Sequence, residues 1–134
     1  MRAGVYLCIC STYYDDKLDL EEVRARIANA PEVDNVLLEE GLCSEADPMA
    51  RDGLIASRKL DTFIVAACAA NEKKFRKSVE SRGVIDYRMK IVRMAELCRR
   101  YPDKQRATDA LCSVLLKLAK GDALHGEEAS WVVQ

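Results

Sequence analysis

Six cysteines are the residues of this chain best suited to chemistry. Four of them stand at or just after the end of an apolar run that is typical of a β-strand: Cys10, Cys43, Cys68 and Cys98. A cysteine thiolate is a nucleophile and a metal ligand. We therefore examine whether four sulfurs that lie 33, 25 and 30 positions apart along the chain meet in the fold.

Four strand-like runs alternate with helical patterns, which predicts an α/β fold. The runs cover residues 4–11, 33–42, 62–68 and 87–94, and the third is apolar on both faces and therefore central. Right-handed crossovers then predict a three-layer sandwich with a four-stranded parallel sheet, order 2-1-3-4, and helices on both faces. We expect a single α/β domain over residues 1–121, followed by a C-terminal tail over 122–134.

Capping residues indicate where the helices begin. Asp19, with Glu22 three residues later, predicts the start of a first helix. Asp103 predicts the start of a last helix that ends before Gly121, with a core-facing stripe of Ala107, Leu111, Val114, Leu115 and Leu118. A second helix is expected after residues 44–47 and a third after residue 71. Residues 96–98 are expected to lead from the fourth strand into a basic loop over residues 99–102.

The predicted topology gathers the four cysteines. All strands of a parallel sheet end at the same edge, so Cys10, Cys43, Cys68 and Cys98 are expected to converge there. Helix N-termini open onto that edge and lower thiol pKa values. Basic side chains close to this edge in sequence could offset the charge of four thiolates: Arg76, Arg99, Arg100 and Lys104.

Spacing alone leaves several kinds of site open. Structural zinc usually takes thiolates from close pairs such as C-x₂-C, and the nearest pair here is Cys8 and Cys10. An iron-sulfur cluster accepts four cysteines from separate elements. A thiol or disulfide redox site and inert buried cysteines also fit the spacing. Cys8 is expected to fill the core, or else to replace Cys10 as a ligand, and Cys112 to be filler within the last helix.

Composition narrows the class of protein. The 134 residues carry a net charge of -1, but residues 1–67 hold 7 basic and 13 acidic side chains against 14 and 9 in residues 68–134. Because only 6% of residues are aromatic, nucleic-acid binding is not expected.

No apolar run approaches the roughly 20 residues of a membrane helix, so we expect a soluble, cytoplasmic protein. His125 is the one histidine and lies in the tail, so no Ser/His/Asp or Cys/His catalytic arrangement is expected.

At the cysteines the chain resembles a known family. The matching segments are Cys8-Ile-Cys10, Cys43-Ser44, Val65-Ala-Ala-Cys68, Phe75-Arg76 and Glu96-Leu-Cys98. They look like the cysteine motifs of the N-terminal domain found in the A subunit of heterodisulfide reductase, over residues 4–120. The chain differs from that pattern at Ser11, where the family has Gly, at Ala69-Ala70, where it has Ser-Pro, and at Arg99, where it has Ser-Trp.

The resemblance implies an iron-sulfur domain from the electron-transfer machinery of an anaerobe. It implies a [4Fe-4S] cluster on Cys10, Cys43, Cys68 and Cys98 that relays electrons within a heterodisulfide reductase-like complex. The chain has no G-x-G-x-x-G and no C-x₂-C-x₂-C run, so the flavin and ferredoxin-like groups would belong to partner subunits. Two different functions compete with this one: a docking or regulatory module with zinc or bare thiols, and a thiol-disulfide relay.

Overall fold

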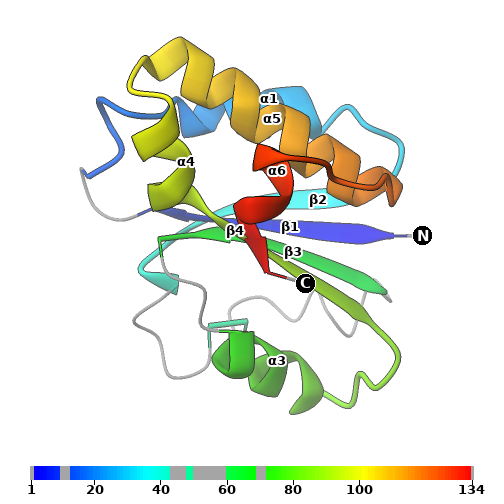
Figure 1. The fold of residues 1–134 in the computed structure, drawn as a ribbon. Helices are drawn as coiled ribbons and strands as arrows, with labels where there is room; N and C mark the ends of the chain where they lie inside the picture. Colours follow the sequence, from blue (N-terminus) through cyan, green and yellow to red (C-terminus); the bar gives the residue numbers. More distant parts are fainter. Residues whose placement is uncertain (1, 10–12, 43–47, 50–59, 69–71, 134) are drawn as a thin grey trace.

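A computed structural model shows a twisted sheet between two layers of helices (Figure 1). The structure describes residues 2–9, 13–42, 48–49, 60–68 and 72–133. Most of the expected second helix, residues 44–60, lies outside the described residues. In the part that is described, no helix is long and apolar enough to cross a bilayer.

The sheet has the predicted parallel centre. Its order is β2-β1-β3-β4-β5, with bounds β1 (Ala3–Ile9), β2 (Val33–Glu40), β3 (Thr62–Ala67), β4 (Arg88–Arg93) and β5 (Val132–Val133). The first four strands are parallel in the order 2-1-3-4, which confirms that part of the prediction. Every residue of β3 is buried, as its apolar sequence and its central place require.

The prediction of four strands was wrong by one. β5 pairs antiparallel with β4, so β4 is not an edge strand. A strand of two residues is too short to produce the alternation of apolar and polar residues from which strands are recognised. It forms because Trp131 is buried beside it, and because the backbone N–H of Arg93 donates to the carbonyl of Trp131 at 2.8 Å.

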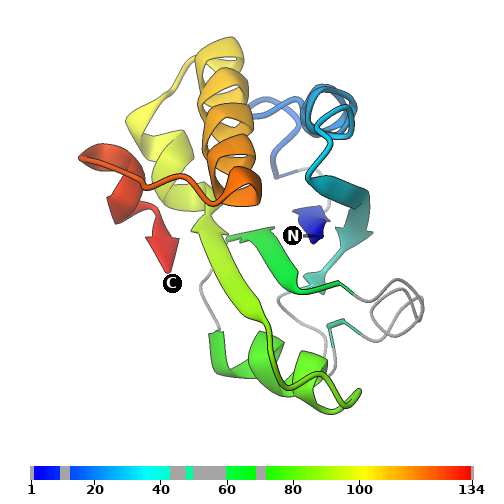
Figure 2. The ribbon, with the colours of Figure 1, turned by 90° about the vertical axis from the view of Figure 1, so that its right-hand side faces the viewer.

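Helices cover both faces of the sheet (Figure 2). On one side lie α1 (Leu20–Ile27), α4 (Met94–Arg100), α5 (Lys104–Lys120) and the short α6 (Glu127–Ser130); on the other lies α3 (Glu72–Glu80). The caps are as predicted: the carboxylates of Asp19 and Asp103 accept hydrogen bonds from the N–H groups of Glu22 and Arg106, both at 3.0 Å. Gly121 ends α5 in the left-handed conformation that glycine favours.

The expected basic loop after β4 is instead a helix. α4 begins at Met94, directly after β4, and ends at Arg100, so Cys98 lies inside it. The segment Met-Ala-Glu-Leu-Cys-Arg-Arg consists mostly of strong helix formers, and Pro102 stops the helix two residues beyond its end. Because no residue separates β4 from α4, this helix begins at the carboxyl edge of the sheet.

Candidate functional site

Cys68 and Cys98 meet at the carboxyl edge of the sheet. Cys68 follows the last residue of β3, and Cys98 lies in α4, which follows the neighbouring strand β4. Both are half-buried cysteines, and they are close enough that negative charge on Cys68 raises the pKa of Cys98. The structure thus brings together two of the four predicted ligands, 30 positions apart. Cys10 and Cys43 lie outside the described residues.

The electrostatics at Cys98 differ from the expectation. Cys98 lies in the second turn of α4 rather than before a helix, so it is not placed at a positive helix end. Burial is the largest influence and raises its pKa to about 11; the charge of Cys68 acts in the same direction, and Lys17 opposes them. Such a thiol keeps its proton near neutral pH unless a bound metal ion displaces it.

Tyr14 lies beside this pair of thiols and contacts one of them. Its side chain is 3% exposed, and its hydroxyl donates a hydrogen bond to the Sγ of Cys68 at 2.9 Å. Burial and this hydrogen bond raise the pKa of Tyr14, and the charges of Cys68 and Cys98 add to the effect. The hydroxyl therefore remains protonated and can donate over the physiological pH range.

A pocket of about 330 Å³ opens beside Cys98. Its lining residues come from the loop after β1 and from α4 with the turn that follows it: Tyr13, Asp16, Lys17, Ala95, Cys98, Arg99, Tyr101 and Pro102. The ammonium of Lys17 lies 4.3 Å from the centre of the Tyr13 ring and donates to the Tyr13 carbonyl at 3.1 Å. A second pocket of about 290 Å³, on the β2 side of the same edge, includes Tyr14 and Lys104. Cys98 and Tyr14 therefore each line a pocket at this edge.

The predicted cations are only partly at this edge. Arg99 and Lys104 line the two pockets. Arg76 instead forms an ion pair with Glu72 within α3, with Nε 2.6 Å from the carboxylate. Arg100 pairs across to α6, where its Nε lies 2.8 Å from Glu127.

Cys8 and Cys112 are both completely buried. Cys8 lies within β1, and Cys112 faces the core from the middle of α5. Burial raises the pKa of Cys112 to about 11. The surroundings of both residues suit a small apolar side chain that fills the core, as the sequence predicts.

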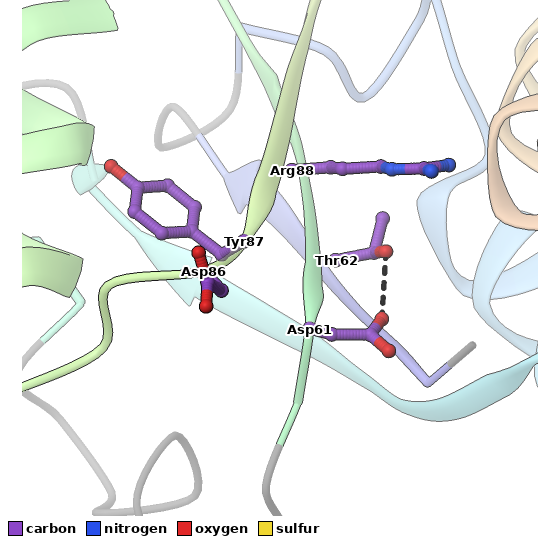
Figure 3. A pocket seen from close by; sticks show the side chains of 5 residues that line it. All are labelled: Asp61, Thr62, Asp86, Tyr87 and Arg88. Carbon is purple, nitrogen blue, oxygen red and sulfur yellow. Dashed lines mark hydrogen bonds between the residues drawn. The ribbon is translucent and has the colours of Figure 1, made fainter.

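A larger pocket, of about 500 Å³, lies at the opposite edge of the sheet (Figure 3). Thr62 and Arg88 are the first residues of β3 and β4, and Asp61, Asp86 and Tyr87 complete the lining. Figure 3 shows Tyr87 and Arg88 pointing to opposite sides and Asp61 bonded to the Thr62 hydroxyl, at 2.9 Å. No described residue of this lining is a cysteine, and open α/β sheets bind ligands at the other, carboxyl edge.

Within the described parts of the chain, no group of three or more His, Cys, Asp or Glu side chains is placed to hold a metal ion. Cys68 and Cys98 form a pair there, and the remaining two expected ligands are not among those residues. Two half-buried sulfur donors from separate segments, one of which accepts a hydrogen bond from Tyr14, are nevertheless a chemically suitable half of a four-cysteine iron-sulfur site.

The sequence reasoning missed Tyr14 and Lys17. Both lie in the loop that follows the first strand, whose polar composition indicates only a connection. The signal available was position: a tyrosine pair, Tyr13 and Tyr14, lies three and four positions after Cys10, in the first loop at the carboxyl edge. Sequence could not show which of the two rings turns inward, because that depends on the turn in which the N–H groups of Lys17 and Leu18 both donate to the Tyr14 carbonyl.

The comparison with known proteins agrees with the resemblance in the cysteine motifs. The chain is 34% identical over 103 residues to the A subunit of the ferredoxin/F(420)H(2)-dependent CoB-CoM heterodisulfide reductase of Methanosarcina acetivorans. The alignment covers 73% of this chain but spans only 13% of that relative, which is consistent with similarity to one domain of a larger protein. No family model matches the chain.

Proposed function

We propose that this chain is an iron-sulfur electron-transfer domain that works with other redox subunits, as part of a heterodisulfide reductase-like complex. The observation that carries the proposal is the meeting of Cys68 and Cys98 at the carboxyl edge of the sheet. The similarity to the A subunit of a heterodisulfide reductase supports the same class of function. Residues 1–121 would carry the site.

The proposed ligands are Cys10, Cys43, Cys68 and Cys98, and the proposed group is a [4Fe-4S] cluster. Such a cluster would supply reversible one-electron transfer. The last residue of β1 is Ile9, directly before Cys10, and β1 pairs with β3, whose end is followed by Cys68. The order of the strands therefore favours Cys10 over the buried Cys8 as the first ligand.

The chain's own residues hold the site in two ways. α4 folds back from β4 and carries Cys98 to the end of β3, so the two thiols are positioned by rigid elements rather than by one loop. Lys17 lies close enough to lower the pKa of Cys98 against the effect of burial, which favours the thiolate that a metal requires. We assign no catalytic residue to this chain.

Single cysteine substitutions test this proposal in the full chain, purified without oxygen. We expect Cys68→Ser and Cys98→Ser, and likewise Cys10→Ser and Cys43→Ser, to lose most of the bound iron and acid-labile sulfide. Cys112→Ala and Cys8→Ala are the matched controls, because both side chains are buried in the core, and they should retain iron. The measurement is iron and sulfide per chain, together with the visible absorption that bleaches on reduction.

Three results would contradict the proposal. A colourless protein with one zinc ion per chain would indicate a docking or regulatory module. A metal-free protein that reversibly loses two free thiols would indicate a thiol-disulfide relay. A relay that used Cys8 is disfavoured, because thiol-disulfide exchange requires access for an attacking thiolate and Cys8 is fully buried. Retention of iron in both Cys68→Ser and Cys98→Ser would remove the site from this edge.

A further inference from the structure

In the described part of the loop between β1 and α1, the Tyr14 side chain reaches the sulfur of a proposed ligand. The Tyr14 hydroxyl donates to the Sγ of Cys68 at 2.9 Å, across 54 positions of sequence. Tyr14 is 3% exposed, whereas its neighbour Tyr13 is 52% exposed. Of two adjacent tyrosines, one is thus buried against the thiol and the other faces solvent.

The backbone around Tyr14 is fixed locally. The N–H groups of Lys17 and Leu18 donate to the Tyr14 carbonyl at 3.0 and 2.9 Å, which closes a turn directly after this residue. The Tyr13 ring packs edge to face on the Tyr14 ring, with the ring centres 4.8 Å apart. The phenol therefore approaches Cys68 from a defined direction.

The same loop is anchored to the start of α5 (Figure 1). The ammonium of Lys104 donates to the carbonyl of Asp15 at 2.6 Å. The N–H of Asp19 donates to the hydroxyl of Thr108 at 3.0 Å, and Thr108 is fully buried. Two bonds to one helix, on either side of the turn, hold the loop against the carboxyl edge of the sheet.

From this geometry we propose that Tyr14 is a positioning residue whose hydroxyl, bonded to the Cys68 sulfur, raises the reduction potential of the metal centre that Cys68 holds. The inference rests on the proposed function. Reduction places additional negative charge on the ligand sulfurs, and a donor aimed at one of them stabilises the reduced form more than the oxidised form.

The test compares Tyr14→Phe with wild type in the full chain, by anaerobic potentiometric titration. Phenylalanine keeps the ring and removes only the donor, so we expect unchanged iron content and a lower midpoint potential. A tenfold change in the ratio of reduced to oxidised protein corresponds to about 59 mV for one electron, and we expect a shift of that order. Tyr13→Phe is the matched control and should leave the potential unchanged, because Tyr13 is half exposed and contacts Lys17 through its ring and carbonyl.

A spectroscopic readout follows the proton itself. In the reduced protein, pulsed electron paramagnetic resonance after transfer to D₂O should detect an exchangeable hydrogen coupled to the electron spin. We expect Tyr14→Phe to lose this coupling and Tyr13→Phe to keep it. A role in packing alone would change neither the potential nor this signal.

The outcomes separate this inference from the proposed function. Wild-type protein without iron would overturn both. Iron-loaded Tyr14→Phe with the wild-type potential, or a folded Tyr14→Phe that no longer holds iron, would overturn the role of Tyr14 alone. If Tyr14→Phe does not fold, Thr108→Val decides: it removes the bond that holds the loop to the buried Thr108 hydroxyl without changing any charge, so the potential should fall in the same direction by a smaller amount. An unchanged potential in Thr108→Val would then overturn the inference.

Discussion

Cys98 and Cys112 show how burial acts on thiols with different neighbours. Burial raises the pKa of each to about 11. Cys98 is half-buried beside Cys68 and Lys17 and lines a pocket, whereas Cys112 is completely buried in the core. A metal ion can displace the proton of an accessible thiol such as Cys98 and bind the thiolate. A fully buried thiol such as Cys112 contributes to stability through its packing and by staying protonated.

The raised pKa of Cys112 predicts a loss of stability at alkaline pH. In the unfolded chain this thiol ionises at its ordinary pKa of about 8.5, whereas the folded chain keeps it protonated to about pH 11. The stabilisation is therefore fully present below about pH 8.5 and declines as the pH rises toward 11, by at most about 1.4 kcal/mol per pH unit. Urea unfolding at several pH values, in wild type and in Cys112→Ala, measures it.

The comparison of these two proteins isolates this one group. Cys112→Ala should be less stable than wild type at pH 7, because it leaves a small cavity, and the difference should narrow above pH 8.5. Parallel pH profiles for the two proteins would show that Cys112 ionises equally easily in the folded and unfolded states.

The approach of Cys68 to Cys98 could be predicted from the sequence, but the side chains that surround these two cysteines could not. That Cys68 and Cys98 lie near each other follows in part from the neighbouring ends of β3 and β4 at one sheet edge, but the place of Cys98 in the second turn of α4 was not predicted. Tyr14 and Lys17 depend on the path of an irregular loop, and Arg76 and Arg100 on the carboxylates that they find nearby. Such contacts are chosen in three dimensions, so sequence spacing does not reveal them.

At the scale of elements, the loop between β1 and α1 depends on α5. The Thr108 hydroxyl accepts from the N–H of Asp19 at 3.0 Å and donates to the carbonyl of Lys104 at 2.8 Å. The first bond crosses between elements, and the second lies within α5. One buried side chain thus joins the start of α1 to the first turns of α5.

Thr108→Val tests this connection. Valine has nearly the same shape but accepts no hydrogen bond, so the N–H of Asp19 loses its partner, at a cost of about 1–3 kcal/mol in the free energy of unfolding. Urea unfolding gives this cost, and amide hydrogen exchange should be faster at Asp19. Thr108→Ser keeps the hydroxyl and loses only a methyl group, so its Asp19 amide should exchange as in wild type. Equal exchange in both variants would show that water replaces the bond at no cost.

The elements themselves were predicted where local signals exist. Asp19 and Asp103 begin their helices as the capping spacing indicates, and the apolar run at residues 62–68 is the central strand. α4 was missed because its seven residues are too few to show a helical period, and because the basic pair Arg99-Arg100 resembles a loop. The packing of α4 on β3 and α5 decides its conformation.

At the scale of the whole molecule, the C-terminal tail belongs to the same packed unit as the sheet. Trp131 is 6% exposed, and its ring centre lies 5.7 Å from that of Tyr101, which follows α4. Lys117 of α5 holds the Glu128 carboxylate with its Nζ 2.7 and 2.8 Å from the two oxygens. The tail is thus attached to α4, to α5 and, through β5, to the sheet.

Trp131 is the one tryptophan of the chain, and its fluorescence therefore reports on the tail alone. We expect the urea midpoint from Trp131 fluorescence to coincide with that from far-ultraviolet circular dichroism, because the tail shares the core of the domain. A fluorescence transition at lower urea would show that residues 122–134 unfold separately.

Trp131→Ala should lower the free energy of unfolding by about 3–5 kcal/mol, the usual cost of removing a buried aromatic side chain.

The place of β5 also bears on self-association. An open strand edge is a template on which another chain can add a strand and begin an aggregate. β5 occupies the outer side of β4, and β2, at the far end of the described sheet, carries the carboxylates Glu39 and Glu40 at its end, whereas its Asp34 is paired with Arg2. Like charges discourage one copy of this strand from pairing with another. The protein is thus protected at one end of its sheet by its own tail and at the other by electrostatic repulsion, and acidification weakens the second protection before the first.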